Sequence, residues 1–187
     1  LEEYDLLFAE GKIVSIDQNI QPSPETDIYE IYGKHVVPGY VAGFTRIGLT
    51  EISAVKQTND HSETGDINPN TREKVENNPD SDLIPVTRSN GIMIVNSVPS
   101  SGTVPGQSSI MMLDGWTWED ATLNHPSGLH INWPQMGIRT SGWYSNVSES
   151  RQKERIKKAL ERLDEIVLKS RAYSKLRNAK SQKSTDY

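Results

Sequence analysis

The sequence predicts an α/β protein, and three of its features indicate this class. Two short apolar runs near the N-terminus flank a tight turn, a continuous apolar run at 92–95 follows a short helical segment, and a long periodic segment begins near residue 148. Short strands are therefore expected first, then a helix-to-strand step, and then a charged helix.

The N-terminal segment predicts a β-hairpin. Residues 4–16 contain two apolar runs on either side of Glu10-Gly11-Lys12, which is a hairpin signal. Alternating apolar residues at 28–32 and the pair at 36–37 predict two further short strands.

Residues 83–99 predict a helix followed by a buried strand. The segment 83–88 leads to Gly91, which suits the C-terminal end of a helix. The run 92–95, Ile-Met-Ile-Val, is typical of a parallel strand that is covered on both faces. By contrast, residues 50–82 are polar and predict a loop.

The C-terminal segment predicts an amphipathic helix from Ser148 to about Lys180. Its apolar stripe has helical spacing, and the end from Ser181 is expected to fray. Residues 148–187 hold 12 of the 20 lysines and arginines against six acids, although the whole chain has a net charge of -5. The stripe consists of Ile156, Leu160, Leu163 and Val167.

Size and composition restrict the class of protein. The chain has 187 residues, enough for a domain with its own core. Only 34% of the residues are hydrophobic, and no apolar run approaches the roughly 18 residues of a membrane span. Because there is no cysteine, disulfides and thiolate metal sites are excluded. No leader peptide is evident, and the compartment stays open.

The most specific motif spans residues 36–49, Val-Val-Pro-Gly-Tyr-Val-Ala-Gly-Phe-Thr-Arg-Ile-Gly-Leu. It resembles the first barrel strand of the amidohydrolase superfamily, in particular imidazolonepropionase-like metal-dependent hydrolases. In that family the phrase reads Pro-Gly, two hydrophobic residues, Asp-Ala-His-x-His, a hydrophobic residue and Gly. Pro38, Gly39, Ile47 and Gly48 match it.

Neighbouring phrases extend the resemblance over residues 4–120. Residues 69–72, 78–81, 87–94 and 106–115 are similar to successive family phrases, and 123–133 resembles the family's third barrel strand. The resemblance implies a small β-sandwich portion at 1–38. It also implies the first two to three strands of a TIM-like (β/α)8 barrel at 39–147, incomplete in this chain, followed by a charged helix and tail at 148–187.

The two metal-ligand positions of the family motif hold Phe44 and Arg46, and the preceding Asp is replaced by Ala42. Zinc needs imidazole or carboxylate ligands, whereas a phenyl ring has no lone pair and a guanidinium is cationic. Active family members are expected to use zinc or another divalent metal. For this segment the sequence predicts no metal, no cofactor and no catalytic residue.

The small, polar segment 98–109 predicts a βα-loop of the barrel, where a complete enzyme binds substrate. Its candidate substrate positions are Ser100, Ser101, Gly102 and Gln107. His125 and His130 are five residues apart, which fits neither a helical nor a strand zinc pair, so a structural role is favoured for both.

Three functional hypotheses stay open. The chain is a fragment of an amidohydrolase-family protein, a hydrolase of non-peptide C–N bonds, in which this copy is inactive and scaffolds or binds. Alternatively, it belongs to a working metal-dependent amidohydrolase whose ligands lie elsewhere in a longer protein. A third hypothesis is an interaction module that uses the basic C-terminal helix. Expected partners are the remainder of the barrel, a second amidohydrolase unit or another copy of the chain, and nucleic acid is disfavoured.

Overall fold

The computed structural model describes residues 3–142 and 146–184, with side chains of the last helix described to Ala179. The chain forms two compact units, Leu1–Pro38 and Gly39–Tyr187. Among the described residues, no helix combines the length and the apolar character that a membrane crossing needs.

The first unit contains the predicted hairpin. Strands β1 (Asp5–Ala9) and β2 (Lys12–Asp17) pair antiparallel. The two residues between them, Glu10 and Gly11, both have positive φ, as the favoured two-residue hairpin turn requires.

The further strands predicted at 28–32 and 36–37 do not form. Residues 18–39 contain no strand, and the apolar side chains of 28, 29 and 32 are mostly exposed. A strand needs a neighbour to bond its backbone groups, and no neighbour is present here within the described part of the unit. Of the expected β-sandwich portion, only the hairpin is formed.

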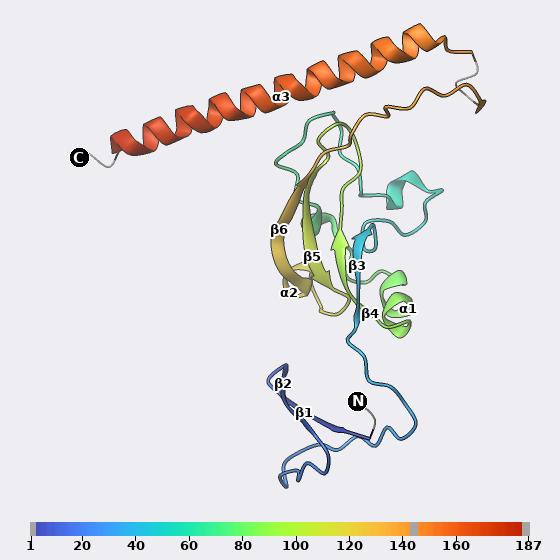
Figure 1. Ribbon diagram of the computed structural model, residues 1–187, viewed down its shortest axis with the longest axis vertical. Helices are drawn as coiled ribbons and strands as arrows, with labels where there is room; N and C mark the ends of the chain where they lie inside the picture. Colours follow the sequence, from blue (N-terminus) through green and yellow to red (C-terminus); the bar gives the residue numbers. More distant parts are fainter. Residues whose placement is uncertain (1–2, 143–145, 185–187) are drawn as a thin grey trace. The chain divides into compact units, whose positions relative to one another are not determined.

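The second unit contains a four-stranded sheet in the order β3-β4-β5-β6. Its strands are β3 (Tyr40–Thr45), β4 (Ile92–Ser97), β5 (Gly106–Met112) and β6 (Thr122–His130). Figure 1 shows β4, β5 and β6 side by side, with α1 next to β3 and β4. The described strands form an open sheet and not a closed barrel.

Only the first pair of strands follows the barrel pattern. β3 and β4 are parallel, as predicted, and the long segment between them includes η1 (Lys56–Thr58), η2 (Glu73–Glu76) and α1 (Leu83–Ser89). β5 and β6 are antiparallel to their neighbours, so the prediction of a third parallel barrel strand at 123–133 is wrong. The connections 98–105 and 113–121 are shorter than the dozen or so residues that a parallel crossover needs.

The core lies between the sheet and the segments that cover one of its faces. Val95, Met111, Leu113 and Ala121 are buried together, and Ile84 of α1 packs against them. Ala121 ends the short helix α2 (Trp118–Ala121), whose Thr117 side chain accepts a hydrogen bond from the Asp120 amide.

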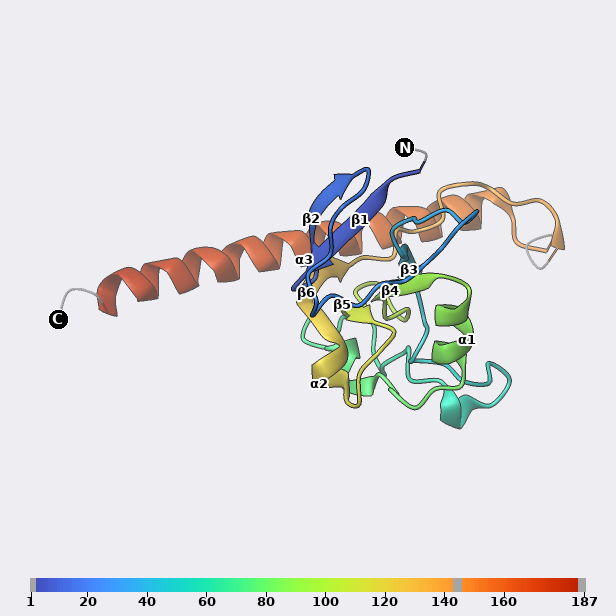
Figure 2. The ribbon, with the colours of Figure 1, turned by 90° about the horizontal axis from the view of Figure 1, so that it is seen from below.

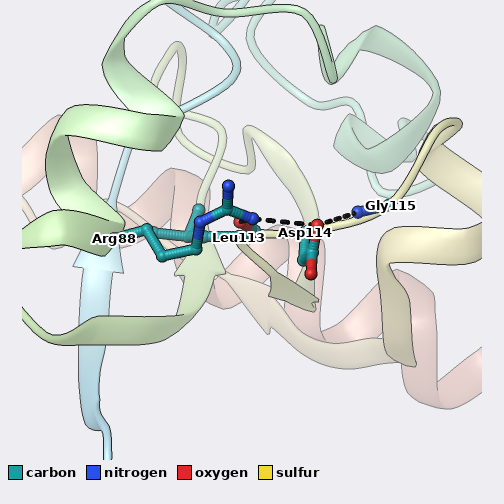
Figure 3. Close-up of polar contacts among 4 residues, drawn as sticks. All are labelled: Arg88, Leu113, Asp114 and Gly115. Carbon is teal, nitrogen blue, oxygen red and sulfur yellow. Dashed lines mark hydrogen bonds and ion pairs between the residues drawn. The ribbon is translucent and has the colours of Figure 1, made fainter.

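Arg88 connects the C-terminal end of α1 to the residues that follow β5 (Figure 3). Arg88 Nη1 donates to the Leu113 carbonyl at 3.2 Å and pairs with Asp114 Oδ1 at 2.8 Å. The same carboxylate oxygen accepts from the Gly115 amide. Gly91 has a φ of 86° and donates to the Arg88 carbonyl, as predicted for a helix end.

The predicted charged helix is α3 (Glu149–Ser184), and it continues past residue 181, where fraying was expected. Residues 185–187 lie outside the described part of the chain. Gln152 and Leu163 are buried, and Arg162 pairs with Asp66 at 2.8 Å, so the N-terminal half contacts the body of the unit. All side chains from Val167 to Ala179 are exposed, and α3 extends past the sheet there (Figures 1 and 2).

Candidate functional site

The two motif positions that define the candidate site lie at the end of β3. Phe44 is 69% exposed, and its ring and that of His130 form a T-shaped contact with 6.4 Å between the ring centroids. Arg46 follows the strand and is exposed, so solvent surrounds its charge.

Phe44 and His130 come from β3 and β6 and meet across one face of the sheet. β3 and β6 are its opposite edges, which in a flat sheet of four strands would lie about 14 Å apart. The two rings approach far closer than that. We call the face that carries both rings the inner face.

The residues present do not fit a catalytic metal. Phe44 offers no electron pair to a metal ion, and Arg46 carries a permanent positive charge that repels a divalent ion. In the described ranges, no three histidine, cysteine, aspartate or glutamate side chains come together in a way that could hold a metal ion.

The charge of Arg46 also affects the nearest histidine. His61 accepts from or donates to Thr50 Oγ1 through Nδ1 at 2.9 Å. Burial lowers the pKa of His61, the positive charge of Arg46 lowers it further, and Asp60 partly opposes both effects. A neutral imidazole is thus favoured.

The four candidate substrate positions contact other segments of the same chain. The Ser100 amide donates to the His61 carbonyl at 2.8 Å, and Ser101 Oγ donates to the Glu63 carbonyl at 3.0 Å. Gln107 Nε2 donates to the Pro69 carbonyl at 2.8 Å. Gly102 lies directly against the backbone of Asp66.

The prediction of a βα-loop over 98–109 is wrong for its last part, because β5 begins at Gly106. The segment turns back along β4 and does not lead into a helix. Its polar groups join residues 98–107 to the loop 61–69.

A hydrogen-bond network that was not among the sequence-based predictions crosses the inner face. Asn96 Nδ2 donates to the Gly43 carbonyl, and Asn96 Oδ1 accepts from Ser127 Oγ at 2.7 Å. Ser127 and Ser108 share a 2.7 Å hydrogen bond, and Ser108 Oγ lies 2.7 Å from His130 Nε2. The network links all four strands.

A second network lies on the opposite, covered face. Ser109 Oγ donates to Glu73 Oε2 at 3.1 Å and lies 2.7 Å from His125 Nδ1. Glu73 is 0% exposed, and its Oε1 has no hydrogen-bond partner in the described structure. Burial raises the pKa of Glu73 to about 7, although hydrogen bonds from Ser109 and the backbone oppose this.

The sequence did contain one signal for these two networks. Successive residues of a strand point to opposite faces, so Ser108 and Ser109 separate. In β6 the alternation is interrupted where its register against β5 shifts, and His125 bonds Ser109 whereas Ser127 and His130 bond Ser108. Each face thus receives one serine–histidine pair. Because Ser108 and Ser109 are both 0% exposed, neither hydroxyl is accessible to a substrate as a nucleophile.

A pair of glutamates lies near the candidate substrate loop. Burial, together with a hydrogen bond to Glu63 and the charges of Glu63 and Asp60, raises the pKa of Glu76 to about 7. The backbone carbonyl of Glu63 also accepts a hydrogen bond from the Ser101 hydroxyl. A proton on Glu76 removes its repulsion with the neighbouring carboxylates.

The fold and the site together define an α/β protein with a four-stranded sheet, in whose described residues no group of metal ligands is found at the end of β3. No protein-family model and no curated protein sequence matches the chain. The chain is similar in structure to an amidohydrolase from Thermotoga maritima MSB8, with a TM-score of 0.66 and 24% sequence identity. The match covers 89% of this chain and 44% of the Thermotoga protein, so the chain spans less than half of that protein's length. At this identity the likeness shows the fold alone.

Proposed function

We propose that this chain is a segment of an amidohydrolase-like protein, related to imidazolonepropionase-like enzymes, in which this copy of the barrel is catalytically inactive. It contributes to a TIM-like barrel and serves as a scaffold or binding unit. The proposal rests on Phe44, which occupies a metal-ligand position of the family motif. Its phenyl ring contacts His130 and has no electron pair to offer a metal ion. Arg46 reinforces this through its positive charge.

The expected partner is the remainder of a barrel or a second amidohydrolase unit that pairs with the edge strand β3. β3 is an edge strand that pairs only with β4 in the described structure. Tyr40, Val41 and Phe44 on this strand are each more than half exposed. An exposed apolar edge strand is a surface that favours pairing with another strand.

Turnover measurements test the proposed inactivity. The chain is incubated with a panel of cyclic amides, with and without added zinc, and we expect no hydrolysis above the protein-free rate. A double variant, Phe44→His with Arg46→His, restores two ligands but not the remaining set, so it is also expected to show no turnover. Zinc-dependent hydrolysis by the unmodified chain would favour a working enzyme with ligands elsewhere and would refute the proposal.

A second candidate function is binding of an acidic protein surface by the C-terminal half of α3. In the N-terminal half, lysines pair with glutamates four residues away, as in Glu149–Lys153 and Glu154–Lys158. Arg171, Lys175 and Arg177 are exposed, and none of them has an ion-pair partner in the described part of the chain. Their charge is therefore available to a partner.

Binding of the full chain to polyglutamate, measured at increasing salt, tests this second function. We expect binding at low salt that weakens about tenfold or more by physiological ionic strength, because exposed charges are screened. Replacing Arg171, Lys175 and Arg177 by glutamine should abolish binding, whereas glutamine at the paired Lys153 and Lys158 should reduce it less. Binding that salt does not change would contradict the hypothesis, and stronger binding to DNA than to polyglutamate would assign the helix to nucleic acid.

A further inference from the structure

Three side chains from three different elements form a continuous hydrogen-bonded chain on the covered face of the sheet. Glu73 comes from η2, Ser109 from β5 and His125 from β6. Ser109 Oγ lies 3.1 Å from Glu73 Oε2 and 2.7 Å from His125 Nδ1. Glu73 and Ser109 are fully buried, whereas His125 is half-buried, so the chain leads from the interior to the surface.

The serine hydroxyl has a single hydrogen and lies between two groups that can each accept it. When Glu73 is ionised, the hydroxyl donates to the carboxylate, and the neutral imidazole must then carry its proton on Nδ1 to donate to Ser109 Oγ. When Glu73 is protonated, the carboxyl donates to Ser109 Oγ. The hydroxyl then donates to a bare Nδ1, and the imidazole proton is on Nε2.

We propose that the Ser109 hydroxyl couples the ionisation of Glu73 to the tautomer of His125, which makes these three residues a pH-sensitive relay between a buried carboxyl group and the protein surface. When the pH rises, one proton leaves Glu73 for solvent and the hydroxyl rotates from Nδ1 to Oε2. The ring proton moves from Nε2 to Nδ1 by exchange with solvent. The number of protons on the ring stays the same, and the net charge falls by one.

The surroundings favour this order of events near neutral pH. Glu73 Oε1 lacks a partner in the described structure, and burial raises the pKa of Glu73 to about 7. Burial lowers the pKa of His125, the charges of Lys74 and Arg72 lower it further, and a hydrogen bond with the Ser108 backbone opposes these effects. The imidazole is therefore neutral while Glu73 titrates.

Other titratable groups also lie near the relay. Lys74 lies over the Trp118 ring at 5.1 Å from its centroid, and Glu76 is the remaining acid of η2. His130, the second histidine of β6, bonds Ser108 on the other face of the sheet and takes no part in the relay.

Nitrogen-15 NMR of the ring of His125 in the full chain tests the relay from pH 5 to pH 9. Protonated and bare ring nitrogens have well-separated shifts, so the tautomer is read directly, and carboxyl carbon-13 shifts report the titration of Glu73. We expect His125 to change from the Nε2–H to the Nδ1–H form with the same midpoint as Glu73. In Glu73→Gln and in Ser109→Ala, this pH-dependent change should disappear.

Ser108→Ala serves as the matched control, because its hydroxyl bonds His130. This variant should alter the His130 shifts and leave the His125 transition in place. Backbone amide spectra identify any variant that fails to fold. If a variant does not fold, the midpoints of the Glu73 and His125 transitions in the unmodified chain still test the inference. A His125 tautomer that stays constant while Glu73 titrates, or a transition that persists with the same midpoint in Ser109→Ala, overturns the inference.

Discussion

Replacing Gly102 by alanine is expected to lower the free energy of unfolding by about 2–5 kcal/mol. Gly102 has a φ of +68°, which is unfavourable for a residue with a Cβ atom. The added Cβ would lie 2.7 Å from both Cα and the carbonyl oxygen of Asp66. Because these are backbone atoms, the clash is relieved only by separating the two loops.

Urea unfolding of the variant, followed by circular dichroism, measures this loss. Gly137→Ala is the control, since nothing lies within 4 Å of the added Cβ and no left-handed φ is required there. This control should change the free energy of unfolding by less than about 0.5 kcal/mol. If Gly102→Ala were as stable as the control, the packing of residues 98–107 against 61–69 would be wrong.

Replacing Glu73 by glutamine is expected to stabilise the protein at pH 8 by up to about 3 kcal/mol and to have little effect near pH 4.5. The pKa of Glu73 rises from 4.5 to about 7 on folding, because burial penalises the carboxylate. The folded state therefore binds more protons than the unfolded state between these values, and stability falls as the pH rises through this window. Glutamine has nearly the same shape and removes the penalty.

The free energy of unfolding is measured for the unmodified protein and for Glu73→Gln at pH 4.5, 6, 7 and 8. The difference between the two values is then followed as a function of pH. Because Glu76 also has a pKa of about 7, only the difference between the two proteins isolates Glu73. A parallel substitution at the exposed Glu119 should give a difference below about 0.5 kcal/mol. A stabilisation by Glu73→Gln that is the same at every pH would contradict the assignment.

Local sequence signals predicted the elements whose formation depends on nearby residues. The hairpin around Glu10 and Gly11, the end of α1 before Gly91 and the long helix from residue 149 all follow from short patterns. The strands expected at 28–32 and 36–37 failed because strand formation also needs a partner from elsewhere. Helices bond internally and are less dependent on such partners.

The main error in the predicted fold was the direction in which the strands pair. The length of the connections explains the antiparallel direction that is observed. Residues 98–105 and 113–121 are too short for parallel crossovers, and this criterion was available from the sequence. For the candidate site, the positions of Phe44 and Arg46 at the end of the first strand of the sheet could be predicted. Glu73 could not be linked to Ser109 and His125, because the contact depends on how η2 packs against the sheet.

The zinc content of the purified chain tests the central claim most directly. The chain is dialysed against excess zinc and then against metal-free buffer, and the bound metal is measured by mass spectrometry. With Phe44 and Arg46 at the ligand positions, we expect far less than one zinc per chain. One zinc retained per chain would contradict the claim that this copy has lost its metal site.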